Sequence, residues 1–577
     1  MPDSKLFAAT SRQPVKGGAI KARAVRISFG RVHMKTNTGQ RPGLTRRGAL
    51  QLGLGSIVAV AAFGPGARIV MAQEGQVLKA INPAFSQDWS PLRGGGVPYR
   101  WNSVWNASAM YFNDKGEIQP YVLTEWSPSA DFLTWTLKVN PDAKFADGSA
   151  ITAADVKGSW ELSSMPGTQN QRIDQVLAGV AGYGAVKDGS ATDISGIKAS
   201  DDGTLTVTLA GPDPIFFQRL ANHIAPIVKV SVARGADGNE VPDFFMGANG
   251  ATSGPFMLES ANLDTGELVW VPNPNFFGPA PALARIELTA VEDNVTATQM
   301  LASGEYQAHT ELVTSTIVQD LGPEFAAGPE IPTSQHFWFN TARAPMDDPK
   351  VREALILAVD RDGLIKASFP DGPHQKTDTV MNAVPGADDP AFVPYPFDPE
   401  RAKALLAESS YGGPDRLPKL MFVGISSPAN EAAAQYIAEQ WRQNLGITAV
   451  DMKPQQDQYS GPDQNAIQIF RDDVGTRVPD APSYLAGSIA STSGNATGKM
   501  SYKNDKVDAL IAEALTKPAD DPARISLAQE AQRLFRDDFC FIPWYRQTMS
   551  RWAAANVAGM EKNLDWQIVA PWTISIS

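Results

Sequence analysis

The residues that could perform catalysis in this chain are few and widely spaced. The only cysteine, Cys540, lies in the apolar run FCFIPW (539–544), which predicts a buried strand. A thiol in apolar surroundings has a raised pKa and is inert, so we expect Cys540 to be a packing residue. The histidines after residue 73 are His223, His309, His336 and His374. They are too far apart in the sequence for two of them to lie on one face of a helix or strand as metal ligands.

Common enzyme signatures are also absent from the sequence. It contains no G-x-S-x-G elbow, no H-E-x-x-H, no Walker loop and no strand-bound G-x-G-x-x-G. Adjacent carboxylates such as Asp347-Asp348 and Asp520-Asp521 point in different directions. We expect Asp347 and Asp520 to start helices instead, because a carboxylate there accepts unpaired backbone N–H groups. The sequence therefore predicts no catalytic residue, no metal site and no cofactor.

The charge is divided unevenly along the 577 residues. Residues 1–72 hold 12 of the 50 lysines and arginines but a single acidic residue, Asp3. The formal net charge of −12 therefore combines a leader of +11 with a body of −23. A body this acidic repels a polyanion, which argues against nucleic-acid binding.

The basic leader is arranged like an export signal. An arginine pair (46–47) precedes the apolar stretch 49–63, and Val70 and Ala72 provide small side chains at positions −3 and −1 for a signal peptidase. This resembles a twin-arginine signal peptide with cleavage after Ala72; Met34 is an alternative start. About 15 apolar residues interrupted by glycine fall short of the ~20 that span a bilayer. We therefore expect export and removal rather than anchoring.

Two hydrophobic periods alternate along the body. Residues 134–139 and 204–209 alternate apolar and polar side chains as strands do, and Asp147-Gly148 predicts a turn between strands. Thr152 and Asp155 have the spacing of a capping box at a helix start. No repeat at a fixed period is visible. The pattern predicts a mixed α/β protein, in which the helix 433–445 carries Tyr436, Ile437, Trp441 and Leu445 on one face.

Ordered sequence blocks over about 450 residues resemble the family 5 extracellular solute-binding proteins. These are the oligopeptide, dipeptide and nickel receptors of ABC importers. The blocks begin with PYVLTEWS (120–127), TWTLKV (134–139) and KFADGSAITAADV (144–156) and continue with GPFML (254–258), VPNPNFF (271–277), FNT (339–341), PMDDPKVREAL (345–355), AVDR (358–361), MSYKNDKVDALI (500–511) and IPWY (542–545), the last being the expected final strand.

The resemblance implies an α/β, two-lobed periplasmic-binding-protein fold (type II, large family 5 form) with a hinge and an interlobe ligand cleft. We expect a removed leader at 1–72, a discontinuous lobe I at 73–336 plus 542–577, and lobe II at 337–541. A periplasmic monomer would capture a peptide-like or opine-like small solute and deliver it to the permease subunits of an ABC importer. Closure would be a hinge motion stabilised by ligand contacts to both lobes.

The resemblance also suggests three segments that line the cleft. One follows the first strand of the body, one lies where the chain crosses between lobes, and one lies in lobe II. Aromatic side chains suit such walls because they combine apolar area with a polar edge. The candidate ligand contacts are Asp88, Trp89, Arg93, His336, Trp338, Asp473, Arg477 and Asp480.

One departure from the family pattern bears on the ligand. Peptide receptors of the family typically carry Ala-Asp-Tyr-x-Asp-Pro in lobe II, where the first Asp pairs with the peptide ammonium. Here Arg477 takes that position, and a buried cation would oppose an ammonium but suit a carboxylate or phosphate. An anionic or zwitterionic solute is therefore expected, such as an opine, a modified peptide or an acidic sugar derivative. In the alternative register, Asp472 or Asp473 takes the ammonium role.

Two other functions are compatible with the sequence. Twin-arginine export carries folded proteins, so an exported enzyme acting on a small solute in the periplasm is the main alternative. A sensory or chaperone role on the same fold is a further one, because fold does not fix function.

Overall fold

The computed structural model of the chain describes residues 76–577 except 83, 87, 95–97, 114, 171, 247–249, 311–320, 322–329, 371–373, 426, 455–456, 458–464, 477, 549–551 and 561–569. The expected signal peptide and its cleavage point lie outside the described residues. No helix among the described residues combines the length and apolar character needed to cross a membrane.

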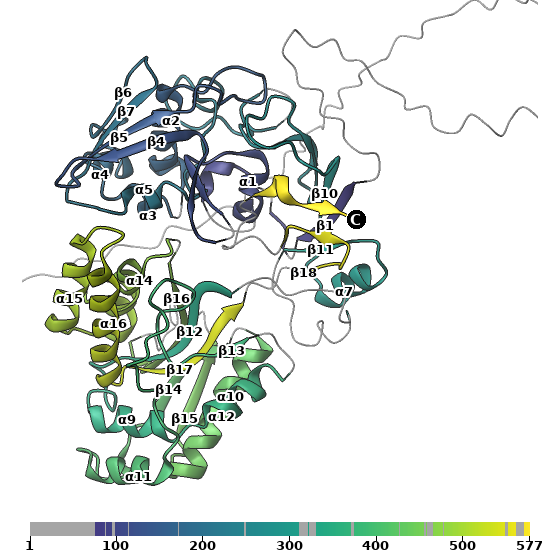
Figure 1. Cartoon of the computed structure of the whole chain (residues 1–577). Helices are drawn as coiled ribbons and strands as arrows, with labels where there is room; N and C mark the ends of the chain where they lie inside the picture. Colours follow the sequence, from purple (N-terminus) through teal and green to yellow (C-terminus); the bar gives the residue numbers. More distant parts are fainter. Residues whose placement is uncertain are drawn as a thin grey trace, which may run out of the picture. The chain divides into compact units, whose positions relative to one another are not determined.

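The first sheet is mixed and has the strand order β18-β11-β1-β10-β9-β8 (Figure 1). Its central strand β1 pairs in parallel with β10 and β11, whereas β8, β9 and β10 form an antiparallel run. In β1, Leu78, Ala80 and Ile81 are fully buried. The strands are β1 (Val77–Asn82), β8 (Phe256–Asn262), β9 (Glu267–Pro272), β10 (Arg285–Ala290), β11 (Ala308–His309) and β18 (Trp552–Ala553).

A four-stranded antiparallel sheet with the order β4-β5-β7-β6 lies in the same half of the sequence. Trp135 and Leu137 of β5 are buried and alternate with more exposed neighbours, as the period of two predicted. The Thr152–Asp155 capping box is confirmed at the start of α2. The strands are β4 (Leu123–Pro128), β5 (Thr134–Val139), β6 (Ile197–Ala199) and β7 (Thr204–Thr208), with a small pair β2 (Met110–Phe112) and β3 (Ile118–Pro120).

The second six-stranded sheet has the order β13-β17-β12-β16-β14-β15 and is built around one long strand. β12 pairs antiparallel with β16 on one side and with β17 on the other. The expected lobe boundaries, at residues 336/337 and 541/542, therefore fall within strands β12 and β17 of this sheet. Its strands are β12 (Glu330–Phe339), β13 (Gln375–Lys376), β14 (Leu420–Ile425), β15 (Val450–Pro454), β16 (Ile469–Gly475) and β17 (Phe541–Thr548).

Most of the long helices belong to the second half of the chain, where they surround the second sheet (Figure 1). In the predicted helix, Ile437, Trp441 and Leu445 are buried on one face. The helices are α1 (Asn102–Trp105), α2 (Ala153–Ser164), α3 (Asp174–Leu177), α4 (Tyr183–Lys187), α5 (Phe216–Arg219), α6 (Val230–Ala233), α7 (Asn294–Ala302), α9 (Pro349–Leu357), α10 (Arg361–Ser368), α11 (Pro399–Glu408), α12 (Pro428–Leu445), α14 (Ala481–Ser488), α15 (Asp505–Thr516) and α16 (Pro522–Asp537).

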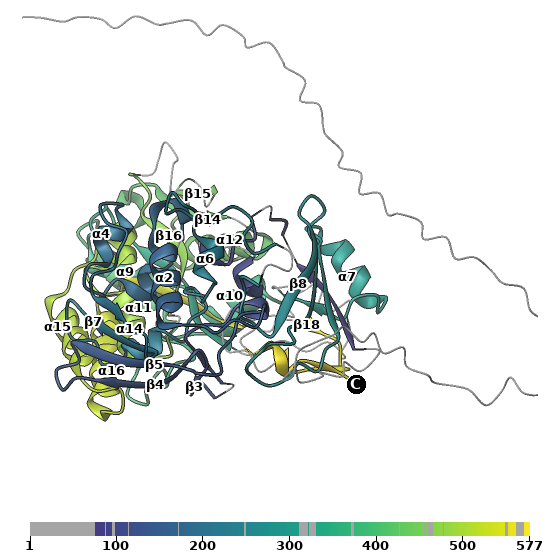
Figure 2. The same cartoon turned by 90° about the horizontal axis from the view of Figure 1, so that it is seen from above.

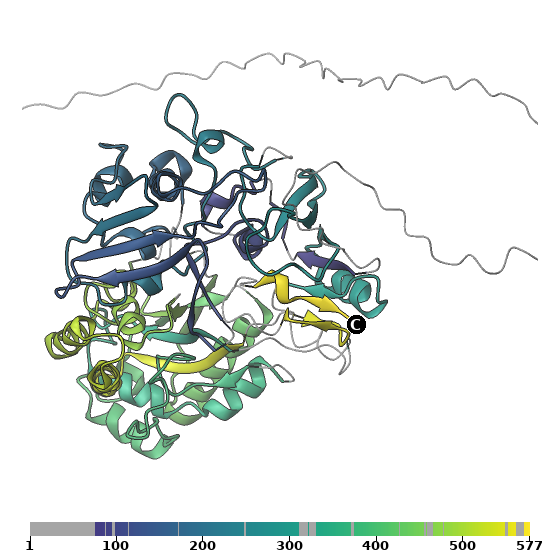
Figure 3. The same cartoon turned by 45° about the horizontal axis from the view of Figure 1, so that its top comes forward.

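Two large hydrophobic cores account for most of the buried side chains. The first core joins described residues between 78 and 308 with Ala553, Val557, Met560, Trp572 and Ile574, and the second core joins described residues between 337 and 545. A smaller cluster packs Ala297 and Leu301 of α7 against Trp552 of β18 (Figure 2). The chain after β17 thus returns to the first half: β18 pairs in the first sheet, and Val557 and Ile574 join the first core, where yellow strands lie beside the C-terminus in Figure 3.

Three local predictions have clear outcomes. Cys540 is fully buried, and burial raises the pKa of its thiol far above the usual value, which confirms its packing role. The helix caps are one residue later than expected, at Asp348 and Asp521. Each precedes a proline at the first helical position, which lacks an N–H group, so the cap must stand directly before it. The strand containing residues 542–545 is followed by β18, β19 (Val557–Ala558) and β20 (Ser575–Ile576), so it is not the last strand.

The start of α15 yields a test of local stability. Asn504 Oδ1 accepts from the Lys506 and Val507 N–H groups, and its Nδ2 donates to Asp538 at 2.7 Å. Removing the cap and this charged hydrogen bond in Asn504→Ala should lower the free energy of unfolding by about 2 kcal/mol. Asn504→Ser keeps a cap acceptor and should lose about half as much, measured by urea unfolding. Equal stability of all three proteins would contradict this account.

Candidate ligand-binding site

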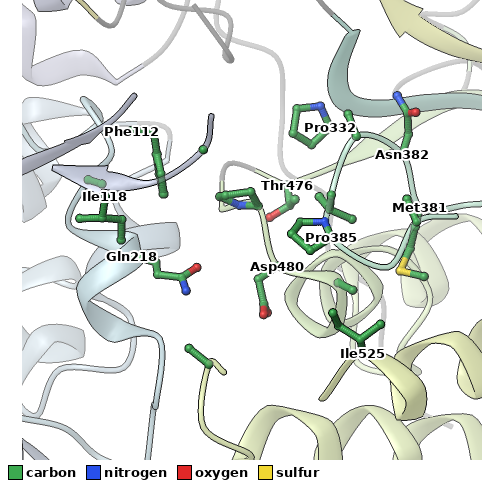
Figure 4. Close-up of a pocket in the computed structure, with 18 of the residues that line it drawn as sticks. Phe112, Ile118, Gln218, Pro332, Met381, Asn382, Pro385, Thr476, Asp480 and Ile525 are labelled. Carbon is green, nitrogen blue, oxygen red and sulfur yellow. The ribbon is translucent and has the colours of Figure 1, made fainter. Parts of the chain in front are cut away.

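The larger cavity described here has a volume of about 760 Å³ and is lined by residues of both halves of the chain. On the side of the first core, half-buried apolar side chains face it: Phe112, Ile118, Trp126 and Phe217. Trp126 and Phe217 are stacked, with ring centroids 6.1 Å apart and planes inclined by 15°. Figure 4 shows Phe112, Ile118 and Gln218 together on this side.

The opposite wall comes from the second half of the chain. Its labelled members in Figure 4 extend from the start of β12, the loop after β13, the loop after β16 and helix α16. Apolar side chains are again frequent among them, and the charged members are Asp388, Asp480, Arg524 and Arg546. The apolar lining residues of this wall include Pro332, Met381, Val384, Pro385, Pro479 and Ile525.

A second cavity of about 580 Å³ has a more polar lining and meets the first. Asn222 and Thr476 line both cavities, which identifies them as the junction. The charged residues of the second cavity are Arg172, Arg219, Lys499 and Asp473.

The junction residue Asn222 is held in one orientation. Its side-chain oxygen accepts from the Tyr99 hydroxyl at 3.2 Å and from the Ile224 N–H at 3.0 Å. The side chain is almost completely buried. Its oxygen is thus used by the protein, and the amide N–H groups are the part that can meet a ligand acceptor.

Arg219, at the end of α5, is positioned by a carboxylate. Its Nε lies 2.7 Å from Oδ2 of Asp213, and both side chains are only partly exposed. The other Asp213 oxygen accepts from the Ile215 N–H. Because Asp213 engages Nε, the two terminal amino groups of the guanidinium can form a planar fork toward the second cavity.

Lys499 enters the same cavity from an unusual turn. It lies in the π-helical segment Ala496–Met500, which is followed by Ser501 in the left-handed region (φ 49°). π-helical turns are frequent at functional sites. The ammonium group forms an ion pair with Asp472, and the Lys499 side chain is 20% exposed. Burial and the neighbouring Arg471 lower the pKa of Lys499 to about 8.

The predicted contact Asp480 lines the larger cavity but is already engaged by the protein. Its two oxygens lie 2.6 and 2.9 Å from Nε and Nη2 of Arg524, and Oδ2 also caps α14. Both side chains are nearly fully buried, at 2% exposed for Arg524 and 8% for Asp480. The Asp480 carboxylate therefore stabilises the fold by pairing with Arg524 and capping α14. Direct contact between Asp480 and a ligand stays a prediction.

The first predicted segment forms a polar cluster of its own. Arg93 pairs with Asp88 and with Glu240, both at 2.6 Å, and Ser90 donates to Glu240. Trp89 is 1% exposed and makes an edge contact with the Trp270 ring in the first core. Among the described residues that line the two cavities, Asp88, Trp89 and Arg93 are absent.

The predicted residues of the crossing strand also lie in a core. His336 and Trp338 of β12 are both fully buried, and their rings meet edge to face at 4.9 Å. His336 Nε2 is 2.7 Å from the Ser334 hydroxyl, which in turn donates to the Val380 carbonyl. Neither ring belongs to the described linings of the two cavities. In the sequence they stand in the run His336-Phe337-Trp338-Phe339, whose aromatic side chains would suit either a core or a cleft wall.

Of the three candidate contacts in the third predicted segment, the structure describes Asp473 and Asp480. Asp473 is exposed and lines the second cavity, about which Arg219 and Lys499 also lie. Arg477 lies outside the described residues.

Sequence reasoning missed four residues that line the cavities: Trp126, Phe217, Arg219 and Lys499. Trp126 lies in the block 120–127, which indicated the family rather than a ligand contact, and for the other three the sequence signal was residue type alone.

The described part of the chain contains no group of three or more His, Cys, Asp or Glu side chains arranged to hold a metal ion. The absence of a metal and of a cofactor stays a prediction.

The buried ion pair between Asp480 and Arg524 predicts a large effect on stability. Asp480→Ala leaves the Arg524 guanidinium buried without its counter-charge and should lower the free energy of unfolding by about 3–5 kcal/mol. Denaturant unfolding measures this loss. In the matched double variant with Arg524→Met both charges are gone, so its loss should be smaller than the sum of the two single losses. Additive losses would show that the two groups are not coupled.

Buried histidines predict acid sensitivity. Burial lowers the pKa of His336 to about 3 and that of His374 to about 4. The unfolded chain binds protons at both sites from about pH 6.5 downward and the folded chain does not, so stability should fall as pH drops from 6.5 toward 3. The loss at pH 5 is about 2 kcal/mol for each histidine.

Urea unfolding at pH 7 and pH 5 measures this dependence. His336→Gln removes one titrating group, so the difference between the two pH values should shrink by about 2 kcal/mol. An unchanged difference would mean that His336 is protonated in the folded protein.

Comparison with known proteins places this architecture in one family. The family described as bacterial extracellular solute-binding proteins, family 5 Middle, matches residues 117–496. The periplasmic oligopeptide-binding protein OppA of Salmonella typhimurium is 25% identical over 542 residues, covering 89% of this chain and 96% of the relative. The glutathione-binding protein GsiB of Salmonella typhi is 27% identical over 465 residues, covering 77% and 84%.

Solved structures agree on the fold. The unliganded open form of the periplasmic murein tripeptide-binding protein MppA matches with a TM-score of 0.72 and 23% identity, covering 88% of this chain and 98% of that chain. The predicted two-lobed α/β fold is thus confirmed, and the members of this family are binding proteins, which disfavours an exported enzyme. The chain is a periplasmic solute-binding protein and belongs to family 5 of the bacterial extracellular solute-binding proteins.

Proposed function

We propose that this protein is the binding component of an ABC importer and captures an anionic or zwitterionic solute, peptide-like or opine-like, for delivery to the permease subunits. The observation that carries the proposal is the pair of joined cavities, whose walls come from both halves of the chain. A ligand that touches both walls would stabilise a closed form of the protein. Relatives that bind oligopeptides, murein peptides or glutathione support a peptide-like solute.

The charge of the cavity walls supports an anionic group on that solute. Among the described residues, the two linings contain six lysines and arginines against three aspartates. This contrasts with residues 73–577 as a whole, which carry −23. Cations concentrated in a cleft of an acidic protein favour an acidic ligand over an ammonium ion.

Arg477 and Asp473 distinguish the two possible alignments of the ammonium-binding segment with the family pattern. Arg477 would oppose a ligand ammonium if it faces the cleft. In the alternative register an aspartate takes the ammonium, and Asp473 suits that role better than Asp472, whose carboxylate is paired with Lys499. A zwitterion could use Asp473 and the cations of the second cavity together.

The remaining features of the proposal concern the whole protein. We expect the leader 1–72 to direct twin-arginine export and to be removed, and the mature protein to act as a monomer. Lobe I would comprise residues 73–336 plus 542–577, and lobe II residues 337–541. The return of residues 553–560 and 570–574 to the first core supports a discontinuous first lobe.

Native mass spectrometry of the protein purified from the periplasm tests the function. We expect a small acidic molecule to be retained intact and released on denaturation. A mixture of unmodified dipeptides should then raise the melting temperature of the emptied protein by less than about 1 °C, because tight binding would add about 2.7 kcal/mol at a hundredfold excess over Kd. Turnover of the retained molecule would contradict a binding role.

Arg477→Asp is the matched variant for the charge preference. It should weaken binding of the retained acid and increase the response to dipeptides. A clear rise of the wild-type melting temperature with dipeptides, or unchanged affinity of Arg477→Asp for the retained solute, would overturn the role of Arg477.

A further inference from the structure

The two joined cavities differ in chemistry, and this difference defines a ligand with two unlike ends. Both described linings contain Lys and Arg side chains, but aromatic side chains line only the larger cavity, whereas the smaller one combines Arg172, Arg219 and Lys499 with Asp473 and has no aromatic member. We propose that the site takes an amphipathic carboxylate whose amine is blocked, such as an acylated amino acid or acylated dipeptide. Its carboxylate binds Arg219 and Lys499, and its apolar body covers Trp126 and Phe217. This inference rests on the proposed solute-binding function.

The apolar end is indicated by side chains that remain partly exposed inside the cavity. Trp126 of β4 and Phe217 of α5 stack on each other, and neither is fully buried. Partly exposed rings at a concave surface gain free energy when a ligand removes them from water. Met381 and Ile525 line the opposite wall, so an apolar ligand group would be covered on two sides.

The carboxylate end is indicated by the way Arg219 is held. Asp213 binds Nε, which fixes the plane of the guanidinium and directs the terminal amino groups away from Asp213. A guanidinium fork matches the two oxygens of a carboxylate. Lys499 adds a second cation to this cavity, and its partner Asp472 is not part of the lining.

The short helix α5 couples the two ends. Phe217 lines the apolar cavity and Arg219 lines the cationic one, although they are only two positions apart. On a helix such residues point in nearly opposite directions. The spacing between the apolar contact and the carboxylate contact is therefore set by one rigid turn.

The junction favours an acceptor rather than an ammonium in the middle of the ligand. Asn222 lines both cavities, and its oxygen is occupied by Tyr99 and Ile224. The amide N–H groups of Asn222 donate to no described residue, so a ligand carbonyl between the two ends can accept from them. An acylated amine supplies such a carbonyl and removes the positive charge that Arg219 and Lys499 would repel.

Calorimetric titration with matched probes tests this assignment. The probes are N-acetyl-Leu-Phe, its C-terminal amide, and unmodified Leu-Phe. We expect N-acetyl-Leu-Phe to bind at least tenfold more tightly than either of the others. Arg219→Gln should reduce the preference for the acid over the amide to about twofold. Trp126→Ala should weaken both acylated probes by a similar factor of about ten and keep the preference.

Two further variants separate recognition from folding. Asp213→Asn retains the Arg219 charge but weakens its positioning, so part of the preference for the acid should be lost with little change in melting temperature. Arg442→Gln removes an exposed arginine paired with Glu439 on α12, outside both linings, and should change nothing.

Several results would overturn the inference. These are equal affinity for acid and amide in the wild-type protein, an undiminished preference in both Arg219→Gln and Asp213→Asn, or no binding of N-acetyl-Leu-Phe. Tight binding of Leu-Phe alone would also overturn it while leaving a solute-binding function intact. Failure of that function is seen separately, as the absence of any retained solute in native mass spectrometry.

Discussion

The register between β12 and β16 is the constraint on which the ligand site depends. β16 pairs antiparallel with β12, so that Thr333 faces Gly475 at the end of the ladder. The Thr476 N–H then donates to the Pro332 carbonyl at 3.0 Å. A side chain at Gly475 could not be accommodated, because its Cβ would lie 2.6 Å from the Pro332 oxygen. A slip of one residue would turn every side chain of β16 to the other face and remove Thr476 from the junction of the cavities.

A recurring arrangement governs the charges around the cavities. Three cations are each held by an aspartate: Arg219 by Asp213, Lys499 by Asp472 and Arg524 by Asp480. The role of each ion pair depends on how deeply its side chains are buried. The Arg524 pair is almost sealed from water and fixes the loop after β16 to α16, whereas Arg219 and Lys499 keep part of their surface toward the second cavity. The same pairing thus serves rigidity in one place and orientation in another.

Local chemistry made the scaffold predictable from the sequence. The capping box of Thr152 and Asp155 needs only residues three apart, and the β5 pattern needs only alternation. The site was harder because its residues meet only after the chain has folded. Trp89 and Trp338 fit a cleft wall as well as a core in sequence terms, and the structure buries both. The family match confirmed the class of function that the ordered blocks predicted, but the blocks lie mainly in scaffold and so carried little information on ligand contacts.

The acidity of the body does not conflict with an acidic ligand. At physiological ionic strength, charges separated by more than about 8 Å of solvent are largely screened, so the net charge of −23 acts weakly on a solute near the cleft. Inside the cavities the distances are short and water is limited, and there the lysines and arginines outnumber the aspartates. Net charge therefore influences solubility and non-specific encounters, whereas selection among solutes depends on the few cations that the fold brings to the junction around Asn222.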